Sequence, residues 1–282
     1  MAETILVTGA SGFIGTHLVA ALRATGHDVR THGIDDSDIT SFTPPTGASA
    51  IVHLAGRGFV RESWQNTPEF YRVNVQGTVQ MLEFCRQARA RLVFVSTYVY
   101  GQPQSLPIAE DHPRAAPSPY HHSKILAEDA CFFYAREFDI PVAIVRLFNV
   151  YGPGQGGGFV IPALMRQALA SDVARISVAD LRPRRDYLYI SDFVDFLLAV
   201  LARRATGPYN AGCGVSTSMG ELIAEVCRAA GADKPVDSRD EFRPNEILDV
   251  CADIGKARRD LGWSPRVSLA EGLLRVREAM TA

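Results

Sequence analysis

The chain has 282 residues, of which 47% are hydrophobic and 21% charged, a balance that suits one large α/β domain or a large domain with a smaller companion. A formal net charge of −2 provides no overall positive field to attract nucleic acid or an acidic membrane surface. The five cysteines lack C-x-x-C spacing, no secretory signal is visible, and no apolar run is long enough to span a bilayer. We therefore expect reduced thiols, no metal site, no nucleic-acid or membrane partner, and a cytoplasmic location.

Strand-like and helix-like segments alternate through the first half of the chain. An apolar, β-branched run over Thr4–Thr8 predicts a buried strand, and helical spacing of apolar residues over Ile14–Thr25 predicts a helix that ends at Gly26. This alternation is typical of β-α-β units and predicts the α/β class, with a Rossmann-like, doubly wound parallel sheet. Further predicted strands are Val29–His32, Ala50–Leu54, Arg91–Ser96 and Val142–Leu147, with helices near Glu69–Ala88 and Tyr120–Phe138.

The pattern changes after Leu147. Glycine and proline crowd residues 151–158, and helical patterns dominate from Phe159 onward, with short strand candidates such as Ala174–Val178. We expect a smaller, mostly helical C-terminal substrate lobe that closes over the carboxyl edge of the sheet, while a helix over Ser191–Leu201 returns to the first domain. The expected dinucleotide-binding domain is 1–149 plus about 185–207, and the expected substrate lobe is about 150–184 plus 208–282.

Three glycines lie between the first predicted strand and its helix, in the segment T-G-A-S-G-F-I-G. Gly9 allows a tight turn, Gly12 lets a pyrophosphate approach the backbone, and Gly15 lets helix and strand pack closely. The helix N-terminus adds unpaired N–H groups that attract an anion. This position after a strand and before a helix predicts a dinucleotide site.

The G-x-x-G-x-x-G spacing resembles that of the extended short-chain dehydrogenases, the NAD-dependent epimerase/dehydratase family. His53-Leu54-Ala55-Gly56 resembles the strand end that lies beside the cofactor in that family, and Asn74–Thr78 is similar to its N-x-x-G-T helix. Asp38-Ile39 resembles the motif that flanks the adenine. The resemblance implies cofactor contacts from Gly9, Ser11, Gly12, Phe13, Ile14, Gly15, Asp35, Asp38, Ile39, Leu54, Ala55, Gly56, Asn74, Tyr120, Lys124 and Phe148.

One feature of the family is missing, which is the acidic residue that ends the second strand and holds the adenosine ribose. Its position falls on Gly33. Asp35 or Asp36 could replace the acid; alternatively, the cofactor carries a 2′-phosphate near Arg30 or His32. NAD is the expected cofactor, and NADP remains open.

Tyr120 and Lys124 form the spacing Y-x-x-x-K, which places both side chains on one face of a helix. A free tyrosine titrates near pH ~10, and a neighbouring ammonium with an oxidised nicotinamide favours its phenolate, which can then exchange a proton with a sugar hydroxyl. Residues 95–101 resemble the family's S-(S/T)-x-x-V-Y-G segment and align the catalytic hydroxyl with Ser96 rather than Thr97. The expected catalytic residues are Ser96, Tyr120 and Lys124.

Several later motifs resemble the parts of the family that bind nucleotide sugars. Residues 146–155 are similar to R-x-F-N-x-Y-G-P-G-Q, and Arg185-Asp186-Tyr187 to its R-D-(F/Y) segment. Arg243-Pro244-Asn245-Glu246 takes the place of R-x-G-D, from which its last two residues depart. A guanidinium fork suits phosphate oxygens. The substrate contacts implied are Ser96, Thr97, Asn149, Arg185, Arg243 and Glu246.

The resemblance implies hydride exchange at C4 of a UDP- or dTDP-hexose, through a 4-keto sugar. A 4-epimerase is the expected function, and an NADPH-dependent 4-keto reductase is the alternative, favoured by the missing acid at Gly33. A 4,6-dehydratase is disfavoured because Thr97 and Tyr98 stand where that enzyme has an Asp-Glu pair. A non-catalytic NAD(P)-binding regulator is disfavoured because the catalytic residues are present. Members of the family often form homodimers, and we expect one here.

Overall fold

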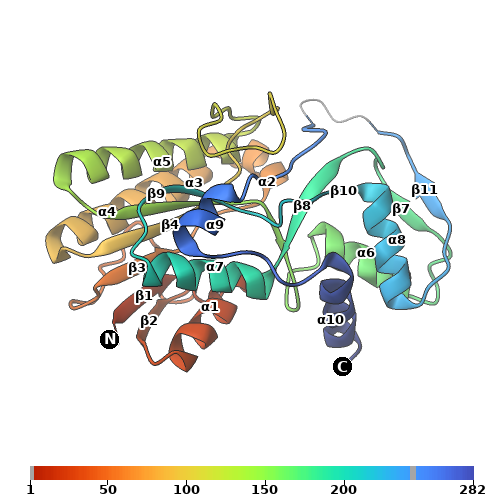
Figure 1. The fold of residues 1–282 in the computed structure, drawn as a ribbon, viewed down its shortest axis with the longest axis horizontal. Helices are drawn as coiled ribbons and strands as arrows, with labels where there is room; N and C mark the ends of the chain where they lie inside the picture. Colours follow the sequence, from red (N-terminus) through yellow and green to blue (C-terminus); the bar gives the residue numbers. More distant parts are fainter. Residues whose placement is uncertain (1–2, 242–245) are drawn as a thin grey trace.

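A computed structural model describes residues 3–241 and 246–282 and shows a parallel sheet flanked by helices, with further elements to one side (Figure 1). The sheet has six strands in the order β2-β1-β3-β4-β5-β9, and every neighbouring pair is parallel. The Rossmann-like fold predicted from the sequence is confirmed. Its strands are β1 Thr4–Thr8, β2 Asp28–His32, β3 Ala50–His53, β4 Arg91–Thr97, β5 Val142–Leu147 and β9 Gly207–Ala211.

Helices cover both faces of this sheet. In the view of Figure 1, α4 (Gly77–Ala88) and α5 (Pro119–Phe138) lie above it, and α1 (Phe13–Ala24) and α7 (Ile190–Ala202) lie below it. The alternation of side chains along each strand divides the core accordingly. In β1, Leu6 belongs to the cluster that packs under α4 and α5, whereas Ile5 and Val7 belong to the cluster on the other face.

The predicted helix near Glu69–Ala88 is interrupted. α2 (Val60–Gln65) precedes it; α3 (Thr67–Tyr71) then runs into a π-helical turn, η1 (Arg72–Gln76), and α4 follows directly. Such wide turns inside helices are frequent at functional sites. Here the turn carries Asn74, whose side chain is buried and bonded toward α5.

The remaining elements form a smaller, mostly helical group around two short sheets. Strand β8 (Arg184–Tyr189) pairs in parallel with β6 (Asn149–Tyr151) and antiparallel with β10 (Ser216–Ser218). The division of the chain into two lobes remains a prediction; β9 pairs with β5 in the large sheet. The other elements of this group are α6 Val160–Leu169, β7 Ile176–Val178, α8 Met219–Ala230, β11 Val236–Ser238 and α10 Leu269–Thr281. Helix α9 (Gly255–Leu261) packs instead against β9 of the large sheet (Figure 1).

In the part of the chain that the structure describes, no helix combines the length and the apolar composition that crossing a membrane requires. The five cysteines are free thiols.

Candidate active site

A cavity of about 620 Å³ lies between the carboxyl edge of the large sheet and the smaller group of elements. This is where ligands bind in open α/β folds. The structure brings many of the predicted site residues together in its wall, namely Gly9, Gly12, Phe13, Ile14, Gly15, Leu54, Gly56, Ser96, Thr97, Tyr120, Phe148 and Asn149.

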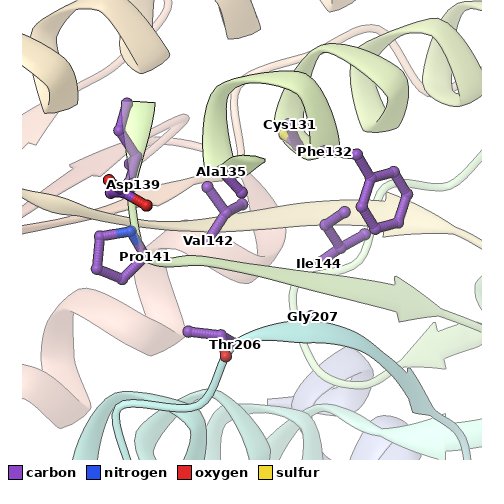
Figure 2. A pocket seen from close by; sticks show the side chains of 10 residues that line it. Cys131, Phe132, Ala135, Asp139, Pro141, Val142, Ile144, Thr206 and Gly207 are labelled. Atoms are coloured by element: carbon purple, nitrogen blue, oxygen red, sulfur yellow. The ribbon is translucent and has the colours of Figure 1, made fainter. Parts of the chain in front are cut away.

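A second cavity, of about 390 Å³, lies at the other end of the same sheet. Figure 2 shows side chains of the C-terminal half of α5, such as Phe132, facing Val142 and Ile144 of β5 across it. It contains none of the residues predicted from the motifs. The cavity at the carboxyl edge is therefore the candidate site.

The glycine loop is shaped for close approach of a ligand. Gly9 has a φ of +69°, and a Cβ there would lie 2.7 Å from the backbone nitrogen of Ala55. A Cβ on Gly15 would lie 2.2 Å from the carbonyl oxygen of Gly9. Helix α1 begins after Gly12 without a side-chain cap, so its first N–H groups can meet a diphosphate. The loop fits the dinucleotide that its sequence predicts.

Other predicted cofactor residues support this loop from outside the cavity wall. Ser11 Oγ accepts a hydrogen bond from the backbone of Ile34, at 3.2 Å. The nitrogen of Ala55 donates to Thr8 Oγ1 at 3.3 Å. Asn74 Nδ2 donates to Ser123 Oγ at 2.9 Å. The first two contacts join the segments that follow β1, β2 and β3, and the third joins η1 to α5.

Two predicted residues near the adenine position are engaged with the protein itself. Asp38 Oδ1 accepts from the nitrogen of Thr40 at 2.9 Å, and Oδ2 accepts from Arg72 Nη1 at 2.6 Å. The hydrogen bond from Thr40 is the main reason that the pKa of Asp38 falls to about 2. Ile39 is buried in the core, and a Cβ on Gly77 would lie 2.9 Å from its Cγ2. These two residues fix the turn after β2.

Tyr120 lies at the start of α5, where Ser118 caps the helix by accepting a hydrogen bond from the nitrogen of His121. Burial raises the pKa of its phenol to about 12, and the neighbouring Thr97 hydroxyl opposes that rise. Ser96, the expected partner, also lines the cavity, but its buried Oγ has no hydrogen-bond partner in the described protein. The structure thus brings Thr97 to Tyr120, and the catalytic role of Ser96 stays a prediction.

Lys124 is buried one helical turn after Tyr120. Its Nζ donates to the carbonyl oxygen of Val95 at 2.9 Å and lies 4.7 Å from the ring centroid of Phe94. Burial lowers its pKa to about 8, against the opposing influence of Glu128. A lysine held this way can carry its proton near neutral pH and still give it up.

Beneath the site, Glu128 and Arg146 form an ion pair whose side chains are 0% and 3% exposed. Arg146 Nη2 donates to Glu128 Oε2 at 2.8 Å, and Arg146 Nη1 donates to Tyr100 Oη at 3.0 Å. Tyr100 in turn donates to Asn210 Oδ1 at 2.5 Å. This chain of buried bonds ties the catalytic helix α5 to β5 and β9.

At the substrate end, Arg185 on β8 is paired with Glu246. Its Nη1 also donates to the carbonyl oxygen of Ile247 at 2.7 Å. The structure therefore brings two predicted substrate residues together, although neither lines the cavity. Asn149 does line it, and its Nδ2 donates to the carbonyl oxygen of Asp186 at 3.4 Å. Arg243 lies outside the described residues.

Several cavity residues were not singled out from the sequence. Tyr98 stacks on Phe148 with ring centroids 5.4 Å apart. Phe59 and Phe159 meet at 5.1 Å and are 49% and 41% exposed, so they form part of the rim. Tyr98 could have been found because it lies inside the serine motif. The two phenylalanines come from distant segments, and no local pattern marks them.

Among the described residues, no group of three or more His, Cys, Asp or Glu side chains is placed to hold a metal ion. A glycine loop at the first strand end and a Tyr-Lys pair on α5 meet in one cavity. This fold and this site define an enzyme of the extended short-chain dehydrogenase type.

Comparison with known proteins identifies the family. The NAD dependent epimerase/dehydratase family matches residues 5–212, so the chain belongs to this family. The predictions of the family and of an NAD-dependent enzyme are confirmed.

The chain is similar to individual members over its whole length. The UDP-glucose 4-epimerase of Mycolicibacterium smegmatis is 33% identical, over 97% of each protein. MoeE5, solved with UDP-glucose and NAD, has a TM-score of 0.90 at 31% identity, covering 99% of this chain and 98% of the other. RMD from Pseudomonas aeruginosa, solved with NADPH, has a TM-score of 0.90 at 26% identity, with the same coverage.

Proposed function

We propose that this enzyme is a 4-epimerase of UDP-hexoses that works with bound NAD. The observation that carries the proposal is the composition of the cavity wall. None of the described residues that line the cavity has a carboxylate. Elimination across C5 and C6 of a sugar needs an acid and a base besides the group acting at C4. Thr97 and Tyr98 stand there instead, and Tyr120 is the one residue placed as a proton carrier by the Y-x-x-x-K motif.

The side chains of the cavity suit proton exchange at a sugar hydroxyl. NAD held by the glycine loop would supply the chemistry of hydride exchange at C4. Tyr120 takes the proton from the C4 hydroxyl and returns it after the 4-keto sugar has turned its other face. Lys124 lowers the cost of the phenolate through its charge. Ser96 and Thr97 line the same cavity as Tyr120.

Two relatives support the proposal, one through its activity and one through its ligands. The M. smegmatis protein is named a UDP-glucose 4-epimerase, and MoeE5 binds both UDP-glucose and NAD. The alternative is an NADPH-dependent reductase of a nucleotide 4-keto-6-deoxyhexose. Gly33 in place of a ribose-binding acid favours it, as does the NADPH in RMD.

The two functions differ in the fate of the hydride, and one pair of assays separates them. We expect the protein to purify with bound NAD(H) and to interconvert UDP-glucose and UDP-galactose without added reductant. A second incubation holds a dTDP-4-keto-6-deoxyhexose and NADPH. Stoichiometric NADPH consumption there, without C4 interconversion in the first, would replace the epimerase by the reductase. Nucleotide sugars can be followed by chromatography and NADPH by its absorbance.

Arg185 is proposed to bind the diphosphate of the substrate. We expect Arg185→Ala to raise KM for the UDP-hexose, with dinucleotide affinity nearly unchanged, because a lost charge-assisted bond to phosphate costs about 1.5–3 kcal/mol. Arg184→Ala is the matched control, since Arg184 is held on the same strand by Ser216 and Glu221. An equal loss of affinity for the dinucleotide and for the sugar nucleotide in Arg185→Ala would contradict the assignment of this arginine to the substrate diphosphate.

The proposal includes a homodimer built through α4 and α5. Phe133 and Phe138 on α5 are 47% and 44% exposed, and exposed aromatic side chains are common at protein interfaces. Light scattering during size-exclusion chromatography measures the state directly. A mass of one chain at micromolar concentration would remove the dimer from the proposal.

A further inference from the structure

Two adjacent histidines follow Tyr120 on α5, and the structure gives them different surroundings. His121 is 5% exposed and belongs to the cavity wall. His122 is exposed, and its Nδ1 lies 2.6 Å from Tyr71 Oη; neither of these two residues is part of the cavity wall. Neighbouring residues of a helix point in different directions, so His121 is the member of the pair that can meet a ligand in the cavity.

The imidazole of His121 is held in place on several sides. Its ring centroid lies 5.1 Å from that of Tyr120 and 6.0 Å from that of Tyr98, both in edge-to-face contact, and both tyrosines line the cavity. Its Nδ1 lies 2.8 Å from Ser118 Oγ. Edge-to-face contact is a favourable arrangement of aromatic rings. The ring is therefore a fixed part of the wall, and Nε2 is the ring nitrogen left for a ligand.

The bond with Ser118 determines which ring nitrogen carries the proton. Ser118 Oγ accepts a hydrogen bond from the backbone nitrogen of His121 at 3.4 Å. Its own proton then needs an acceptor, and among the described residues Nδ1 of His121 is the one that lies within reach. A neutral imidazole accepts at one nitrogen and donates at the other. Nδ1 is thus the acceptor, and Nε2 carries the proton.

The N–H at Nε2 of His121 is a hydrogen-bond donor without a partner in the described part of the chain. A donor in a buried wall needs a partner, because leaving it unpaired costs free energy. Burial also lowers the pKa of His121 to about 4, so the ring is neutral near pH 7 and Nε2 resists taking a second proton. The imidazole can therefore donate to a ligand oxygen, but it is poorly suited to act as a base.

We infer that His121 binds the hexose by donating from Nε2 to the hydroxyl oxygen of C3 or C6. These two hydroxyls lie on either side of C4, whose own hydroxyl meets the neighbouring Tyr120 in the proposed function, on which this inference rests. The contact orients the sugar ring and leaves proton transfer to the tyrosine. The Y-x-x-x-K motif does not specify the residue that follows its tyrosine, so the motif assigns no such role to His121.

Substitution of His121 tests the contact through kcat/KM for UDP-glucose. His121→Phe keeps the ring and removes both nitrogens, and it should lower kcat/KM by roughly 5-fold to 150-fold, the effect of leaving a buried polar partner unpaired. His121→Gln can still donate near the place of Nε2 and should regain most of that loss. His122→Phe is the matched control on the adjacent residue, and it should stay within about twofold of the parent, as expected of an exposed side chain.

Deoxy substrates distinguish a lost contact from a damaged site. The parent and His121→Phe are compared on UDP-3-deoxyglucose and on UDP-6-deoxyglucose. With the analogue that lacks the contacted hydroxyl, the two enzymes should have the same kcat/KM within about twofold, whereas the other analogue should show the full loss. Thermal unfolding and NADH binding check the fold of each variant, and His121→Ala repeats the comparison if the phenylalanine does not fit.

The outcomes for this inference and for the proposed function are separate. A loss in His121→Phe that persists with both analogues, or an equal loss in His122→Phe, would overturn the contact. A parent that interconverts UDP-hexoses, with His121→Phe equally active, would overturn the contact alone. A parent that does not interconvert UDP-hexoses would remove the proposed function and this inference together.

Discussion

Tyr120→Phe should lower kcat for the sugar nucleotide by ~10²–10⁴, the usual value of a positioned proton carrier, while NADH still binds. Tyr120 lines the cavity, so the variant loses the hydroxyl that moves the proton and loses little packing. Rate measurements at saturating substrate, together with NADH fluorescence titration, separate the two effects.

Tyr98→Phe is the matched control for this result. It removes a hydroxyl from the same cavity wall, while the ring keeps its stacking on Phe148. We expect its turnover to stay within about tenfold of the parent, well below the effect of losing a general acid–base group. A Tyr120→Phe enzyme with near-parental kcat would remove this tyrosine from the mechanism.

Glu128→Gln should reduce the free energy of unfolding by about 3–5 kcal/mol, the cost of breaking a buried ion pair from one side. The change leaves the charge of Arg146 in a site where its side chain is 3% exposed. Denaturant titration followed by circular dichroism measures the loss. The exposed pair of Glu137 and Arg136 on α5 offers the control, because Glu137→Gln should cost under about 1 kcal/mol. Similar losses of unfolding free energy in the two variants would contradict a stabilising role for the buried pair of Glu128 and Arg146.

The apolar strands of the large sheet could be predicted closely from the sequence. β1 and β5 have the predicted bounds, because a strand buried on both faces needs a continuous apolar run. β8 and β9 were not predicted. β8 begins Arg-Arg-Asp and β9 begins Gly-Pro, which is unlike a strand. Their structure comes from pairing with β6, β10 and β5, and strand propensity depends strongly on such neighbours.

The site residues could be predicted to the same extent: those in short motifs were found, and contacts between distant segments were not. The glycine loop and the Tyr-Lys pair each lie within a short segment, so the spacing of their residues was enough to predict that they belong to the site. The hydroxyl partner of Tyr120 was harder to predict, because adjacent residues of a strand point to opposite faces. Motif alignment indicates Ser96, whereas the hydroxyl that influences the pKa of Tyr120 belongs to Thr97, and both residues line the cavity. The pairing of Arg185 with Glu246 joins residues 61 positions apart, which no local pattern encodes.

The contact between Phe59 and Phe159 bears on how long a ligand stays. The two rings meet across the rim of the cavity and remain about half exposed. An aromatic pair of this kind contributes about 0.5–1.5 kcal/mol beyond its buried area, so parting the rings slows departure by roughly tenfold at most. The contact between Phe59 and Phe159 is therefore too weak to keep a dinucleotide bound through purification. The part of the site that we expect to hold the dinucleotide is instead the glycine loop, where the backbone allows close approach and the first N–H groups of α1 can meet a diphosphate.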